Sequence, residues 1–310
     1  MARAARKDPE QRPLSDFRAE DFELWLRRPT RFRHAFAEST LSRYLRTAGY
    51  FLDFCAREGI LCADEVNVAW LRKWLIGPDP AKPAYSASTR TVMLSALHLL
   101  YLHWQEAGYA LDNPVEKYLA EAKATQKRGG RAPKPLPTVL SWDEQDALLA
   151  AALDNPRSAT GARDYAMIAL LVVTGLRCEE ACALTVKQLD IAAATLRVTG
   201  KGAKERVVRW SYDAELLRTA IAHWQQYRSS DSPYVLHTRT GAPMTHTLVY
   251  QQLGAYLNKA GIESRRRGPH LLRHTSISRQ LARGVPLLQV QDNAGHESLA
   301  TLQRYAHLLV

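Results

Sequence analysis

The sequence has little cysteine and no long apolar run, and each absence excludes a class of protein. Four cysteines in 310 residues are too few for a disulfide framework. Cys178 and Cys182 stand four residues apart and could share a metal ion, but no second pair of Cys or His has matching spacing, so we expect buried thiols. The longest apolar run, residues 166–173, is far shorter than the roughly 20 residues of a membrane-spanning helix.

A secretory leader is also missing. The N-terminal residues 1–13 carry charges with no apolar stretch behind them. We therefore expect a cytoplasmic protein without a membrane partner, which begins with a flexible solvated arm.

Acidic residues are in deficit, because 31 Asp and Glu stand against 42 Lys and Arg and leave a net charge of +11. This excess predicts a polyanionic partner such as nucleic acid. It is uneven: residues 1–122 have a net charge of +1, residues 138–310 have +5, and residues 123–137 hold five basic and no acidic side chains. Three prolines in that short stretch favour an extended basic linker between two domains, 14–122 and 138–310.

Apolar residues of the first domain recur every three or four positions, which predicts an all-helical unit with a leucine and aromatic core. The expected helices cover 17–26, 41–58 with an N-cap at Ser39 or Thr40, 66–75, and a stretch that begins at Ser86 or Ser88. Basic side chains of this domain and of the linker either contact DNA phosphate or are simply solvated. These candidates are Arg43, Arg46, Arg90, Lys127, Arg128, Arg131 and Lys134.

One hairpin is predicted in the second domain. Residues 195–199 and 206–210 are rich in β-branched side chains and alternate in polarity. Glycines on both sides of Lys201 let the turn approach a phosphate closely, although a plain turn is the alternative. Lys204 and Arg206 of the same hairpin are further candidate DNA contacts.

The helices of the second domain have clear boundary signals. Ser141 and Glu144 form a capping-box pattern. Pro269 occupies a first helical position before His270 and Arg273, which share one helix face. A following helix is expected from Pro286 to Gly295, and Ser298 is expected to cap a last one that carries Tyr305.

Six residues of this domain resemble the catalytic set of the tyrosine recombinase (phage integrase) family, and their spacing resembles the Xer branch. The motifs are TGLRCEEACALT with Arg177, GKGAKER with Lys201, HLLRH with His270 and Arg273, and AGHESLATLQRYAH with His296 and Tyr305. Successive intervals are 24, 69, 3, 23 and 9 residues. The resemblance implies a mainly α fold: a helical, SAM-like core-binding domain and a mixed α catalytic domain with a small antiparallel β-sheet, together a C-shaped clamp on DNA.

The chemistry needs these residue types. Attack of a phenol oxygen on a phosphodiester builds charge on two oxygens, which the guanidiniums of Arg177 and Arg273 can hold through paired hydrogen bonds. The phenol of Tyr305 has an ordinary pKa near 10 and needs help to lose its proton.

The resemblance assigns the remaining roles. Lys201 is the general acid for the leaving 5′-oxygen, and Glu180 is an orienting acid. His270 and His296 bond the phosphate or assist the nucleophile. No metal, ATP or other cofactor is expected. Arg265, Arg266 and Arg267 are candidate phosphate contacts, whereas His274 and His307 are expected to be structural.

The resemblance also implies partners: duplex DNA sites, on which a homotetramer, or a heterotetramer with a second recombinase, exchanges strands through a Holliday junction. Xer-like members usually continue further past the tyrosine than the five residues after Tyr305 here, which leaves the mode of subunit coupling open. Two rivals remain: a DNA-binding regulator without catalysis and a type IB topoisomerase. The complete set of six residues disfavours the regulator, and the two-domain Xer-like layout disfavours the topoisomerase.

Overall fold

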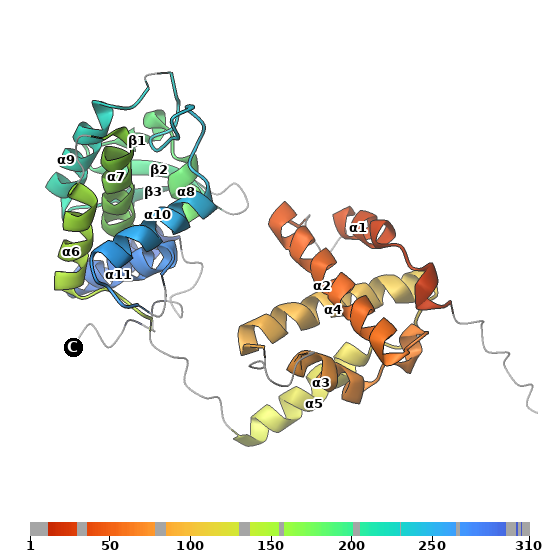
Figure 1. The fold of residues 1–310 in the computed structure, drawn as a ribbon. Helices are drawn as coiled ribbons and strands as arrows, with labels where there is room; N and C mark the ends of the chain where they lie inside the picture. The colour runs from red at the N-terminus through yellow and green to blue at the C-terminus, as the bar shows by residue number, and fades with distance from the viewer. Residues whose placement is uncertain are drawn as a thin grey trace, which may run out of the picture. The chain divides into compact units, whose positions relative to one another are not determined.

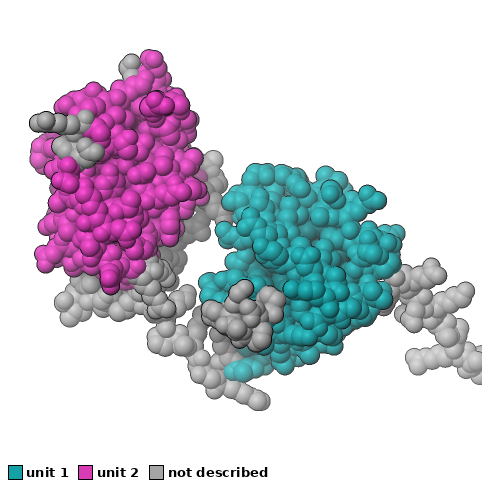
Figure 2. Space-filling model, viewed as in Figure 1, with its two compact units in different colours: residues 1–133 teal, residues 134–310 magenta. Residues whose placement is uncertain are grey.

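The chain forms two compact units, residues 1–133 and 134–310, in a computed structural model (Figure 2). The structure describes residues 12–29, 36–77, 85–129, 137–154, 158–200, 205–229, 231–264, 267–295, 302 and 305. Each unit has its own apolar core. No helix within these ranges has the length and apolar character needed to cross a membrane.

Unit 1 is helical, as expected from its periodicity (Figure 1). Its helices are α1 (Ala19–Arg27), α2 (Glu38–Glu58), α3 (Val68–Ile76), α4 (Ala87–Ala107) and α5 (Pro114–Gly129), with short 3₁₀ turns at Leu14–Asp16 and Ala63–Glu65. Helices α2 and α4 pack together, and Phe51, Tyr101 and Trp104 between them are fully buried. The predicted leucine and aromatic core is confirmed.

Three predicted helix starts in unit 1 are wrong. Helix α1 begins at Ala19, two residues after the expected start at Phe17. Helix α2 begins at Glu38, before the expected caps, because Arg27 of α1 grips the Glu38 carboxylate with two bonds of 2.6 and 3.0 Å. Helix α3 begins at Val68 because the Asn67 side chain accepts the backbone N–H groups of the first turn. Asn is a strong N-cap for this reason.

Helix α5 runs into the segment in which we expected the basic linker. It continues to Gly129, past the expected linker start at Lys123. The residues concerned, AKATQKR, are good helix formers, and two glycines follow them. Local propensity therefore extends the helix, while the prolines that suggested a linker come only afterwards.

Unit 2 joins a bundle of helices to one small sheet. Its elements are α6 (Trp142–Leu153), α7 (Ala159–Thr174), α8 (Cys178–Ala183), a 3₁₀ turn (Val186–Gln188), β1 (Leu189–Asp190), β2 (Thr195–Thr199), β3 (Glu205–Arg209), α9 (Ala214–Gln225), α10 (His246–Lys259), α11 (Pro269–Ala282) and α12 (Leu287–Ala294). Helix α7 is buried almost throughout and packs against α6, α9 and α11 (Figure 1). The expected mainly α fold with a small antiparallel sheet is confirmed.

The sheet places its edge strand beside the last described helix. The strand order is β1-β2-β3, all antiparallel, and Val198 of β2 pairs with Arg206 of β3, so the predicted hairpin is confirmed. Strand β3 is one of the two edges of the sheet, and α12 packs against it. The hairpin therefore lies next to the helix that precedes His296 in sequence.

Several sequence signals in unit 2 act as predicted. Ser141 and Glu144 form the capping box of α6, with reciprocal bonds of 3.0 and 2.7 Å. Pro269 opens α11, and Gly295 follows α12 in the left-handed conformation. Cys178 and Cys182 are buried.

Candidate active site

Arg177 and Glu180 meet at the N-terminus of α8. The Glu180 carboxylate accepts the backbone N–H of Arg177 at 2.8 Å and its guanidinium at 3.0 Å. The carboxylate thus caps the helix and orients the arginine at the same time. The side chain of Arg177 remains 39% exposed, so part of its guanidinium faces outward.

Arg206 approaches the same carboxylate from strand β3. Its two terminal nitrogens donate one bond of 2.8 Å to each oxygen of Glu180. This paired geometry is the strong form of an arginine–carboxylate contact. We expected Arg206 on the DNA surface, but its side chain is only 15% exposed and is directed inward.

The end of α12 receives a third group of contacts. Arg206 donates to the carbonyl of Asn293 at 3.2 Å, Arg273 to Ala294 at 2.6 Å and Arg177 to Gly295 at 2.8 Å. A helix C-terminus carries partial negative charge and unpaired carbonyls, which attract cations. Three guanidiniums therefore converge on the residues directly before His296.

Arg273 is the most buried member of this group, at 5% exposure. It also donates to the carbonyl of Gly175, at 2.7 Å, which joins α11 to the turn before α8. Burial, followed by the nearby positive charge of Arg177, lowers the pKa of Arg273 to about 10. The group stays charged at neutral pH.

Glu180 is ionised despite its burial. Burial acts to raise the pKa of this carboxyl, but bonds from Arg206 and from the Arg177 backbone outweigh it and hold the pKa below its ordinary value. The carboxylate thus balances part of the positive charge that the arginines accumulate.

Tyr305 lies in a small apolar cluster with Ile277, Val290 and Leu302, and it is almost fully buried. Its hydroxyl forms a hydrogen bond with Nδ1 of His274, on α11. The sequence interpretation treated His274 as structural and missed this contact. The available signal was the HLLRH motif, because His274 lies one turn after His270 on the same helix.

His270 itself is exposed, near the start of α11, with its ring centroid 6.5 Å from that of His274. The structure thus gathers Arg177, Glu180, Arg206, Arg273, His270, His274 and Tyr305 around α8, α11 and α12. The other two predicted catalytic residues, Lys201 and His296, lie outside the described residues.

The predicted DNA contacts differ in what surrounds them. Arg43 and Arg46 on α2 and Arg90 on α4 have exposed side chains. Arg267 bonds the side chain of Asn258. Five others lie outside the described residues, as do the side chains of two linker residues on α5; these seven are Arg131, Lys134, Lys204, Arg265, Arg266, Lys127 and Arg128.

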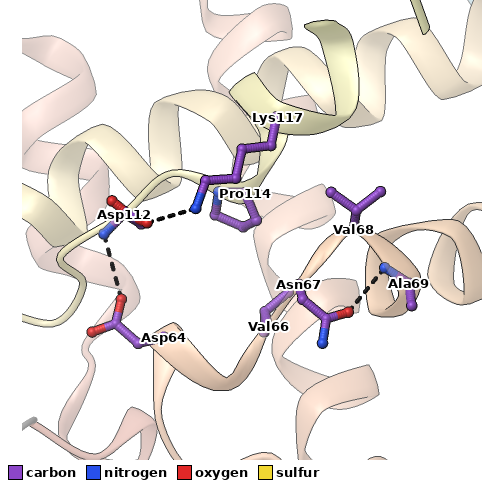
Figure 3. Close-up of a pocket in the computed structure, with 8 residues that line it drawn as sticks. All are labelled: Asp64, Val66, Asn67, Val68, Ala69, Asp112, Pro114 and Lys117. Carbon is purple, nitrogen blue, oxygen red and sulfur yellow. Dashed lines mark hydrogen bonds and ion pairs between the residues drawn. The ribbon is translucent and has the colours of Figure 1, made fainter. Parts of the chain in front are cut away.

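A separate hollow in unit 1 does not have the groups for catalysis. It lies between α3 and α5 and contains two carboxylates (Figure 3). Asp64 accepts the backbone N–H of Leu111 at 2.9 Å, and Asp112 is ion-paired with Lys117 at 2.6 Å. Both acids are thus engaged in holding the loop before α5, so we assign the hollow a structural role.

Comparison with known proteins gives the family of the chain. Residues 138–310 match the phage integrase family. The chain is 30% identical to the tyrosine recombinase XerD of Vibrio cholerae over 286 residues, which cover 89% of this chain and 88% of the relative.

Solved structures share the fold. A post-cleavage complex of the XerH site-specific recombinase with a palindromic difH substrate aligns with a TM-score of 0.68 at 21% identity, over 86% of this chain and 76% of that one. A lambda integrase dimer bound to a COC′ core site aligns with a TM-score of 0.67 at 17% identity, over 93% and 97%. With the family match over more than half of its residues, the chain belongs to the phage integrase family and is a tyrosine-type site-specific DNA recombinase.

Proposed function

We propose that Tyr305 is the nucleophile with which this recombinase cuts and rejoins duplex DNA. The observation that carries the proposal is the convergence of Arg177 and Arg273 on the end of α12, where Ala294, whose carbonyl accepts from Arg273, packs in the same apolar cluster as Tyr305. Two permanently charged guanidiniums and one phenol are the groups that a phosphotyrosine reaction requires.

In the proposed step, the phenol oxygen of Tyr305 attacks the scissile phosphorus and passes its proton to a histidine, His270 or His296. A bond forms between phosphorus and the tyrosine oxygen, and the bond between phosphorus and the 5′-oxygen breaks. Lys201 gives a proton to that 5′-oxygen as it leaves. The product is a 3′-phosphotyrosine link and a free 5′-hydroxyl, and the reverse reaction rejoins the strand without ATP.

The arginines stabilise the charge that builds on the two non-bridging oxygens. His270 and His296 are assigned to bond the phosphate or to assist proton loss from Tyr305. The reaction needs no metal ion, since the side chains supply both the positive charge and the acid.

On DNA we propose four subunits, of this chain alone or with a second recombinase, that exchange strands in pairs through a Holliday junction. Related proteins act on duplex sites: XerH is bound to difH DNA and lambda integrase is bound as a dimer to a core site. Arg43, Arg46 and Arg90 of unit 1 are exposed, and we propose that they contact DNA phosphates. We also propose that the protein works in the cytoplasm, where chromosomal DNA lies.

The test uses a duplex that is selected for binding from a random-sequence pool. The duplex is then nicked beside the expected cleavage point, so that the short fragment released by cleavage dissociates and the strand is not rejoined. The parent protein is expected to form a DNA adduct that survives detergent. Tyr305→Phe lacks the nucleophilic oxygen and is expected to form none, although it binds the same duplex. An adduct with Tyr305→Phe would refute the nucleophile, and binding without any adduct from the parent would favour a regulator.

A further inference from the structure

Arg206 stands where three parts of the site meet. It lies on β3, which leads out of the hairpin that carries Lys201. Its guanidinium binds both oxygens of Glu180 from α8 and the carbonyl of Asn293 from α12. All three of its nitrogens are engaged, and its side chain is 15% exposed.

The contact with α12 is close and specific. A β-carbon at Gly295 would lie 2.9 Å from the central carbon of the Arg206 guanidinium, so the arginine lies directly against the glycine. Beside it, the Asn293 side chain accepts the backbone N–H of Arg209 at 2.9 Å and donates to its carbonyl at 2.8 Å. Helix α12 is thereby held in register with the edge strand.

Glu180 is shared between Arg206 and Arg177. Its oxygen Oε1 accepts from both guanidiniums, at 2.8 and 3.0 Å. Without Arg206, the buried carboxylate would have Arg177 as its main charged partner, and a carboxylate that is left short of partners draws the remaining cation towards it. Arg177 would then be less available to a DNA phosphate.

We propose that Arg206 is a positioning residue of the recombination site: it holds Glu180 and the end of α12 in place, so that Arg177 stays free to bind the scissile phosphate. This inference rests on the function proposed for Arg177 and Tyr305. Arg206 touches neither the phosphate nor the nucleophile in this role, which distinguishes it from a DNA contact.

The experiment measures the adduct rate on the nicked duplex, the affinity for the uncut duplex, and the salt dependence of that affinity. Arg206→Gln is expected to slow adduct formation about 100-fold, the order of loss that follows misplacement of a catalytic group. Its affinity should fall by no more than the loss of one phosphate contact, that of Arg177, which lowers the log–log salt slope by at most about 0.9. Arg209→Gln is the matched control, because it removes the same charge from the same strand and Arg209 meets α12 through its backbone. It should keep the parent rate.

Two further variants separate positioning from folding. Arg206→Lys keeps the charge but cannot make the paired contact, so it should unfold like the parent and still form adduct slowly. In Arg206→Gln/Glu180→Gln the carboxylate no longer attracts Arg177, so the adduct should form faster than with Arg206→Gln alone.

Several results would overturn the inference. A parent rate in Arg206→Lys would show that charge alone suffices. A log–log salt slope that stays about 0.9 below that of the parent in Arg206→Gln/Glu180→Gln, in which Arg177 is released, would show that Arg206 itself contacts a phosphate. Equal rates in Arg206→Gln and Arg209→Gln, with an active parent, would refute positioning while leaving the proposed function intact. An inactive parent would refute the function itself.

Discussion

At the scale of single residues, Glu180 offsets part of the positive charge of the arginines in the site. One buried carboxylate accepts bonds from Arg177 and Arg206, and Arg273 lies close enough for Glu180 to act on its pKa. Three guanidiniums in one place repel one another, and burial strengthens that repulsion. The negative charge of the carboxylate offsets this repulsion in the folded protein. The ionisation of Glu180 therefore contributes to folding stability as well as to the arrangement of the arginines.

The pH dependence of unfolding tests this contribution. The pKa of Glu180 is lower in the folded protein than its ordinary value near 4.5, so its stabilising effect is complete above that value and is lost as the pH falls through the folded pKa. Glu180→Gln should unfold about 3 kcal/mol more easily at pH 7, because it removes one partner of a buried ion pair. The deficit should shrink as the pH falls below about 4.

Chemical denaturation at several pH values measures both effects. The exposed neighbour Glu179 supplies the control as Glu179→Gln. A deficit for Glu180→Gln that did not shrink at any pH below 4.5 would mean that the carboxylate charge is not what stabilises the cluster.

At the scale of elements, two contacts position helix α12: Arg206 lies against Gly295 at its C-terminal end, and the helix packs against strand β3. Gly295 adopts φ +60°, and Arg206 lies against it. A side chain at this position meets two penalties at once: the left-handed backbone costs about 1–2 kcal/mol, and the new β-carbon displaces the guanidinium. Gly284, after α11, also has positive φ but has no neighbour within 4 Å of an added β-carbon.

The two glycines therefore form a matched pair for mutation. Gly284→Ala should reduce the free energy of unfolding by about 1 kcal/mol, and Gly295→Ala should reduce it by clearly more and also slow adduct formation. Urea denaturation and the adduct assay measure these losses. Equal losses in stability would show that Arg206 moves aside without cost.

At the scale of the whole molecule, the positive charge is concentrated in the stretch that spans the boundary between the two units. The two units have separate cores, and the basic stretch that spans their boundary carries five positive charges of the net +11. If that stretch tracks the DNA backbone, its contribution to binding is the release of counterions, which depends on salt. A general attraction from net charge would instead depend little on where the charges lie.

Neutralising the stretch distinguishes these cases. Substitution of four basic residues by Gln should reduce the log–log salt slope of DNA binding by about 0.9 for each lost phosphate contact; the four are Lys127, Arg128, Arg131 and Lys134. Fluorescence anisotropy at several salt concentrations measures the slope. A control removes four exposed charges elsewhere, at Arg18, Arg57, Lys187 and Arg218. The same change in both proteins would contradict a specific role for the stretch.

The sequence by itself determined the local features of this protein. Neighbours in the chain set the cap formed by Ser141 and Glu144, the hairpin, and the helix that begins at Pro269. The spacing of the motif residues was enough to indicate the family. The sequence misplaced the start of α2, because the bond that sets that start comes from Arg27, eleven residues earlier.

Only the tertiary structure decided which side chains meet. Arg206 turned from an expected DNA contact into a partner of Glu180, and His274 turned from a structural residue into a partner of Tyr305. Glu180 and Arg206 are 26 residues apart, and His274 and Tyr305 are 31 apart. Such pairs arise from the packing of elements against one another, which local propensity and periodicity do not encode.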